Sequence, residues 1–341
     1  MIKSDLHLHL EENAKKEDLI KLLQMAEKEE VKGLGVLSYN SLDIYAPNGI
    51  FCQVLDEGIK KYYSGKIVSA VEMVCQIDNV ISPNNFDYYG YRADVCLYDF
   101  DYEKLKKYFL PQTLKQNWIE DFETFKKLSK NLDIEIPSID NFTNDYHPLS
   151  FVEQLMAKYP EIIKQFSDVL GIEINIASDL TRNHITNPKG KLFFEQKLFP
   201  KVSDILKMAK ECNSKVALAH PAYMNKSFDT KDYIESLINF SRSNKDFKEI
   251  EYICGDYMLN TQNDRKIIKE MAQKLNVKLI CGSDMRLIEK MFYLGELSQE
   301  RVYYTPRPGF SIAKEIETKN GDLMMKKEVL DEFNEFTGYN K

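Results

Sequence analysis

Two histidines stand two positions apart in an alternating run near the start of the chain, residues 5–10, DLHLHL. In a β-strand, residues i and i+2 project from the same face, so His7 and His9 would point to one side of a sheet. Two imidazoles on one face can ligate one metal ion. Taken alone, the pair is weak evidence for a metal site, because such pairs are more often two polar residues on a barrel wall.

Four further acidic or imidazole side chains lie at the edges of apolar runs that predict strands. In a parallel α/β protein, reactive groups gather where strands end and loops leave the sheet. A buried carboxylate there is costly unless it is paired or bound to a metal. Each of the four could be structural singly, but six such groups at strand ends, counting His7 and His9, are harder to explain as structural and indicate a functional site. The four are Glu72, Asp94, His220 and Asp284. Asp94 lies at the start of an apolar run, and each of the other three lies at the end of one.

Short apolar runs alternate with amphipathic stretches over much of the chain. Such alternation predicts βαβ units, and therefore a parallel α/β sheet that is open or closed into a barrel. Helical spacing of apolar residues predicts helices over 17–30 and 202–212. The strands are expected at 5–10, 33–37, 66–74, 93–97, 215–220, 249–254 and 277–281.

The alternation breaks between about residues 112 and 200. Segments 112–132 and 148–166 have helical patterns, and 183–191 has a loop composition. Because the strand pattern resumes afterwards, we expect a largely helical insertion in a single barrel domain that spans residues 1–341. A helical tail is expected over about 322–341.

Composition excludes several classes of protein. With 43% hydrophobic and 29% charged residues, the 341-residue chain can bury a sizeable core, which excludes disordered, collagen-like and disulfide-scaffold proteins. The net charge of −7 argues against nucleic acid as a partner. The six cysteines are widely spaced, which favours reduced thiols. No apolar run reaches the roughly 18 residues of a membrane span, and the N-terminus is polar, so a cytoplasmic location is expected.

The order of the short motifs resembles that of the PHP (polymerase and histidinol phosphatase) family. The motifs are DLHLH at 5–9, AVE at 70–72, LAHP at 218–221 and CGSD at 281–284, and the resemblance spans about residues 1–300. It implies a distorted (β/α)7 TIM-like barrel whose usual chemistry is metal-dependent phosphoester hydrolysis.

The resemblance also implies a ligand set. Asp94 stands where the family has a histidine before an x-Leu-x-Tyr string, and aspartate is a competent ligand for zinc, manganese or iron. Two divalent ions are therefore implied. The ligands would be His7, His9 and Asp284 for the first, Glu72 as a bridge, and Asp94 with His220 for the second.

Three positions depart from the family pattern. Ala14 replaces an aspartate, Tyr39 falls within the segment where the family has Thr-Asp-His-Asn, and Arg286 replaces a histidine. All three would serve a third metal, so their joint loss implies a two-metal site. An arginine can clamp a phosphate with two parallel hydrogen bonds, so Arg286 and Tyr39 are expected as phosphate contacts.

The leading hypothesis is a metal-dependent phosphoesterase that resembles histidinol-phosphate phosphatases. It would hydrolyse a small phosphorylated metabolite with metal-activated water. The alternative is a catalytically degenerate barrel that binds a metal or ligand in regulation or assembly. Nuclease activity is a third hypothesis, which the acidic charge balance disfavours.

Overall fold

The computed structural model of the protein describes residues 3–10, 14–28, 30–78, 92–142, 148–187, 189–222, 229–256, 262–282 and 285–287. The chain divides into two compact units. The first comprises residues 1–74, 93–105 and 205–341, and the second comprises 75–92 and 106–204. The second unit contains the whole of the segment, about 112–200, that the sequence predicts as an insertion. The single domain over 1–341 stays a prediction, and the tail at 322–341 lies outside the described residues.

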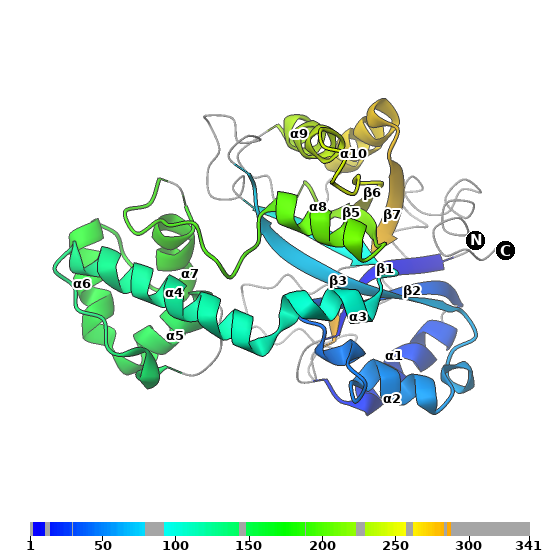
Figure 1. Ribbon diagram of the computed structural model, residues 1–341, viewed down its shortest axis with the longest axis horizontal. Helices are drawn as coiled ribbons and strands as arrows, with labels where there is room; N and C mark the ends of the chain where they lie inside the picture. Colours follow the sequence, from blue (N-terminus) through cyan, green and yellow to red (C-terminus); the bar gives the residue numbers. More distant parts are fainter. Residues whose placement is uncertain are drawn as a thin grey trace. The chain divides into compact units, whose positions relative to one another are not determined.

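An eight-stranded sheet forms the core of the first unit (Figure 1), in the order β7-β6-β5-β4-β3-β2-β1-β8. All seven predicted strands are present, and the three-residue β8 is additional. The strands are β1 (Lys3–Leu10), β2 (Val31–Tyr39), β3 (Lys66–Gln76), β4 (Arg92–Tyr98), β5 (Lys215–Ala219), β6 (Tyr252–Asp256), β7 (Lys278–Gly282) and β8 (Met285–Leu287).

The sheet is mixed, so the α/β class is confirmed but the expectation of only parallel pairing is wrong at β4. The pairs β1–β2, β2–β3, β5–β6, β6–β7 and β1–β8 are parallel, whereas β4 and β5 are antiparallel, with Val95 opposite Leu218. The reversal brings the first residues of β4, including Asp94, to the edge where β5 ends.

Strands β1 and β7 approach each other closely. A Cβ atom built on Gly282 would lie 2.0 Å from Cβ of His7, so only glycine allows this approach. Within the described residues, however, no hydrogen-bonded ladder joins β7 to β1. Closure into a (β/α)7 barrel therefore stays a prediction.

The helices of the first unit include amphipathic ones that bury one face. In α1 (Lys16–Lys28), Leu19, Leu22, Leu23 and Ala26 are buried, which is the spacing of one helical face. In α9 (Thr230–Arg242), the N-cap Asp229 accepts a hydrogen bond from the amide of Lys231. The other helices in the described part of this unit are η1 (Asp43–Tyr45), α2 (Ile50–Asp56), η2 (Ile59–Lys61), α3 (Tyr102–Leu105) and α10 (Gln262–Leu275). Helix α8 (Val202–Glu211) begins in the second unit.

An apolar layer lies immediately beside the predicted site residues along the strands. On β3, Val68 and Ala70 belong to this layer and the next residue of the same face is Glu72. On β4, Cys96 belongs to it, and the next residue of the same face towards the start of the strand is Asp94. The full layer is Leu6, Leu37, Val68, Ala70, Cys96, Tyr98, Ala217, Ala219, Tyr252, Cys254 and Ile280.

The second unit is mainly helical (Figure 1), around an aromatic core that includes Trp118, Phe122, Phe125 and Phe151. The predicted helix over 112–132 is confirmed as α4. The predicted helix over 148–166 is two helices, because Pro160 begins a new one. The loop predicted over 183–191 is wrong at 183–185, which are helical. The elements are η4 (Lys106–Phe109), α4 (Pro111–Lys130), η5 (Ile139–Asn141), α5 (Pro148–Lys158), α6 (Pro160–Leu170), α7 (Ala177–Leu180) and η6 (Thr181–Ile185).

None of the helices in the described part of the chain combines the length and apolar character needed to cross a membrane.

Candidate metal centre

Strand β1 places His7 and His9 side by side, as the alternating sequence predicts. Both side chains are buried, and their Nε2 atoms lie 3.0 Å apart. Two ring nitrogens at this distance either share one proton or direct their lone pairs at a common cation. The pair therefore presents two nitrogen donors that could hold one metal ion.

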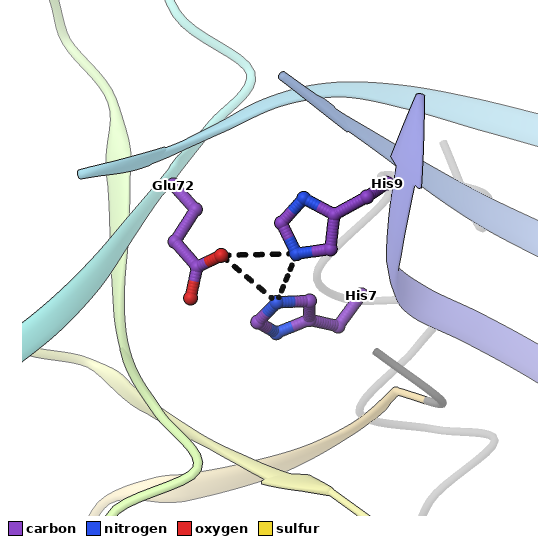
Figure 2. Close-up of side chains that lie close together, drawn as sticks. All are labelled: His7, His9 and Glu72. Atoms are coloured by element: carbon purple, nitrogen blue, oxygen red, sulfur yellow. Dashed lines mark hydrogen bonds and ion pairs between the residues drawn. The ribbon is translucent and has the colours of Figure 1, made fainter. Parts of the chain in front are cut away.

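Glu72 of β3 completes a first cluster, defined by His7, His9 and Glu72 (Figure 2). Oε2 of Glu72 lies 2.9 Å from Nε2 of His9 and 3.5 Å from Nε2 of His7. Nε2 of His7, Nε2 of His9 and Oε2 of Glu72 form a triangle, which the dashed lines in Figure 2 outline. All three residues come from strands of the first unit, so the sheet itself fixes this geometry.

The other oxygen of Glu72 belongs to a second cluster, defined by Glu72, Asp94 and His220. Oε1 of Glu72 lies 2.9 Å from Nε2 of His220, and Oδ2 of Asp94 lies 3.8 Å from the same nitrogen. The structure thus brings together five of the six residues that the sequence predicts as metal ligands. One carboxylate lies between the two clusters and contributes one oxygen to each.

Burial and charge act in opposite directions on Glu72. Burial alone would raise the pKa of its carboxyl, but the imidazoles of His7, His9 and His220 outweigh burial and hold the pKa well below its ordinary value. The group is therefore a carboxylate, which is the form that ligates metals.

The donor atoms fit a divalent transition metal. In a tetrahedral site with metal–ligand bonds of about 2.0–2.1 Å, ligand atoms lie roughly 3.3 Å apart. The first cluster has separations of 2.9, 3.0 and 3.5 Å. Imidazole nitrogen combined with carboxylate oxygen suits zinc, manganese or iron.

His220 is held in an unusual backbone conformation at the end of β5. Its φ angle is +25°, outside the regions that non-glycine residues ordinarily adopt. Its amide donates a 3.0 Å hydrogen bond to the carbonyl of Cys254 on β6, which holds the backbone in place. Strain of this kind is concentrated at functional sites.

The remaining predicted residues are only partly described. The Tyr39 ring packs edge-on against the His9 ring, with centroids 6.0 Å apart. Arg286 pairs with His9 through the β1–β8 ladder, but its side chain lies outside the described residues, as does the whole of Asp284. Their predicted roles, and that of Tyr39 as a phosphate contact, stay predictions. Ala14 is half-buried two residues before α1.

Sequence reasoning missed two residues that contact His7. Oδ1 of Asp5 accepts a 3.2 Å hydrogen bond from the backbone amide of His7, and Asp5 itself is buried. Sγ of Cys96 lies 3.9 Å from Nδ1 of His7, and burial raises the pKa of this thiol well above its ordinary value. The alternation of β1 could have indicated Asp5, which shares a face with His7 and His9. No sequence signal distinguishes Cys96 from an ordinary core cysteine.

Comparison with known proteins gives a likeness of fold at low sequence identity. No protein-family model matches the sequence, and no curated protein matches it. The structure is similar to that of an amidohydrolase from Chromobacterium violaceum crystallised with sulfate and without metal, with a TM-score of 0.53 and 12% identity. It also resembles a protein from Bifidobacterium adolescentis described as a metal-dependent phosphoesterase, with a TM-score of 0.48 and 11% identity. Each match covers 93% of this chain and 96% of the other.

Proposed function

We propose that the protein is a metal-dependent phosphoesterase that hydrolyses a small phosphomonoester with water. The observation that carries this proposal is the shared carboxylate of Glu72, with imidazoles of His9 and His220 each 2.9 Å from a different oxygen. Such an arrangement suits a pair of divalent ions. The order of the motifs, which resembles the PHP family, supports the choice of phosphoester over other substrates.

Each residue of the two clusters has a distinct task in this proposal. Together with Asp284, His7 and His9 would hold the first ion; Asp94 and His220 would hold the second, and Glu72 would supply one carboxylate oxygen to each. When bound, the ions would polarise a phosphoryl oxygen and lower the pKa of a water molecule. The low exposure of the donor residues, at most 8%, limits competition by solvent for the same positions. We assign the phosphate contacts to Tyr39 and Arg286, each adjacent to His9.

The test compares two glutamate variants. The full chain, purified without chelator, is assayed for metal content and for hydrolysis of p-nitrophenyl phosphate and of a panel of sugar and amino-alcohol phosphates. Glu72→Gln should lose bound metal and reduce turnover by about a hundredfold or more, because it removes the shared ligand. Glu57→Gln, a partly exposed glutamate paired with Lys16, should change neither. Chelator should abolish wild-type turnover, and turnover that persists without metal would overturn the proposal.

A second candidate is a metal-binding barrel without turnover. Tyr39 favours this candidate. It lies within the segment where the PHP pattern has a further metal-binding histidine, and its ring packs against that of His9. Stoichiometric metal binding with no hydrolysis of any phosphomonoester would favour this candidate. Because a structural neighbour is an amidohydrolase, the panel should include N-acyl amino acids, and turnover of these alone would replace the phosphoesterase proposal.

A further inference from the structure

Asn40, the first residue after β2, makes two hydrogen bonds that enclose Glu72 and Met73 of β3. Its backbone amide donates to the carbonyl of Glu72 at 2.8 Å. Its side-chain Oδ1 accepts from the amide of Val74 at 2.9 Å. The φ angle of Asn40 is +49°, so the main chain turns away from β3 while the side chain returns to it.

These two bonds reproduce the pattern of a parallel β-ladder. In such a ladder, a residue donates to the neighbour before its partner and accepts from the neighbour after it. Tyr39 is paired with Glu72, so the partner of Asn40 would be Met73. Asn40 makes both expected bonds, but its side-chain carbonyl replaces its main-chain carbonyl. The ladder is thereby extended by one residue beyond the end of β2.

This extension lies on the strand between the two strands that carry Glu72 and His9 of the first cluster. In the sheet, β2 lies between β3, which carries Glu72, and β1, which carries His9. The distance of 2.9 Å between Glu72 and His9 therefore depends on how β2 holds each neighbour. His9 is level with Leu37 on β2, two residues before Tyr39, so the final residues of β2 align both ligands.

We propose that Asn40 is a positioning residue for Glu72, and this inference rests on the metal-centre function proposed above. Each oxygen of Glu72 has its own imidazole partner at 2.9 Å, so a displacement of the Glu72 backbone would disturb both contacts. Asparagine suits the position for two reasons. It tolerates a left-handed backbone better than other non-glycine residues, and its side chain supplies a carbonyl acceptor.

Three substitutions separate these two properties. Asn40→Asp keeps an acceptor oxygen and tolerates the same φ angle. Asn40→Gly keeps the φ angle at no steric cost but removes the acceptor. Asn40→Ala removes the acceptor and adds backbone strain, so comparison with Asn40→Gly isolates the contribution of strain.

The first measurement is the affinity of the full chain for Mn²⁺ by calorimetric titration, with the midpoint of denaturant unfolding of the metal-free protein beside it. Asn40→Gly should weaken Mn²⁺ binding about tenfold, and Asn40→Asp should stay within about threefold of wild type. A merely structural role would lower the unfolding midpoint of Asn40→Gly and leave its Mn²⁺ affinity unchanged, which would overturn the inference.

The second measurement does not need metal. In crystal structures of the metal-free variants, the Glu72 carboxylate should move away from His9 and His220 in Asn40→Gly and keep its position in Asn40→Asp. An unmoved carboxylate in Asn40→Gly would overturn the inference whether or not the wild type binds metal. Failure of the wild type to bind any metal would instead overturn the proposed function.

Discussion

Oε1 of Glu72 lies 2.9 Å from Nε2 of His220, although the two residues are 148 positions apart in the chain. The contact depends on β3 and β5 ending at the same edge of the sheet, with the reversed β4 between them. Because the other oxygen of Glu72 faces His9, a single side chain connects residues from three segments of the sequence. Substitutions around it should therefore separate the two clusters in a predictable way.

His9→Ala and Asp94→Asn should each remove one ion and leave the other. His9 belongs only to the first cluster and Asp94 only to the second. We expect the metal content to fall from about two ions per chain to about one in either variant, and further in the double variant. Elemental analysis after gel filtration measures this directly. Equal loss of both ions in Asp94→Asn would show that the clusters do not fill separately.

Tyr98→Phe should lower the free energy of unfolding by about 1–2 kcal/mol. The hydroxyl of Tyr98, on β4, donates a 2.9 Å hydrogen bond to the carbonyl of Leu6 on β1, although β3 and β2 lie between these strands in the sheet order. Both residues are buried, so water cannot replace the lost bond without cost. Denaturant unfolding of the metal-free protein tests the change. Tyr62→Phe is the control, because the Tyr62 hydroxyl makes only a 3.4 Å contact with Glu57, and an equal loss there would contradict the argument.

Gly282→Ala should destabilise the first unit and weaken metal binding together. The added Cβ would lie 2.0 Å from Cβ of His7 and 2.9 Å from its Cα and N, so β7 must move away from β1 or displace His7. Forced contacts of this kind cost about 1–3 kcal/mol.

Gly171→Ala provides the matched control for this substitution. No atom lies within 4 Å of the added Cβ at position 171, and the remaining cost is that of its positive φ angle. We expect this control to be milder in thermal unfolding and neutral in metal affinity. Unchanged metal affinity in Gly282→Ala would indicate that His7 is not constrained by β7.

The stability that Asp121 contributes should decrease as the pH rises from about 4 to above 6. Burial raises the pKa of this carboxyl to about 6, against the partial compensation of backbone hydrogen bonds from Lys197 and Leu198. The folded protein therefore binds a proton over a pH range in which the unfolded chain has released it, and stability falls through that range.

Asp121→Asn removes this titration. The difference in free energy of unfolding between wild type and Asp121→Asn should change by on the order of 2 kcal/mol between pH 4.5 and 7.5, in favour of the wild type at the acidic end. Urea unfolding at a series of pH values measures the difference. A difference that is constant with pH would contradict the raised pKa.

Much of the site could be predicted because its chemistry coincides with the ends of strands. The alternation of β1 predicted that His7 and His9 share a face, and the apolar run before Glu72 predicted its place at the end of β3. Asp94 needed the resemblance to a known family. Its position at the start of a strand fits the site only because β4 is reversed. The alternation of apolar residues within one strand does not indicate whether that strand runs parallel or antiparallel to its neighbours.

Other features depend on pairs of residues that no local pattern connects. The approach of Gly282 to His7 and the hydrogen bond from Tyr98 to Leu6 are properties of how strands meet, so the sequence around each residue did not indicate them. Asn40 is not among the residues that the sequence predicts for the site. Its role in extending the ladder needed the register of β2 and β3.

The two clusters also differ in when they can be assembled during synthesis. All three residues of the first cluster have been translated once synthesis passes Glu72. The second cluster also requires His220, which is translated after the entire helical unit. A nascent chain would therefore possess one donor set well before the other. An ion captured early would order the β1–β3 portion while the rest of the sheet is still being translated, because a ligand that binds only the folded form stabilises it by mass action.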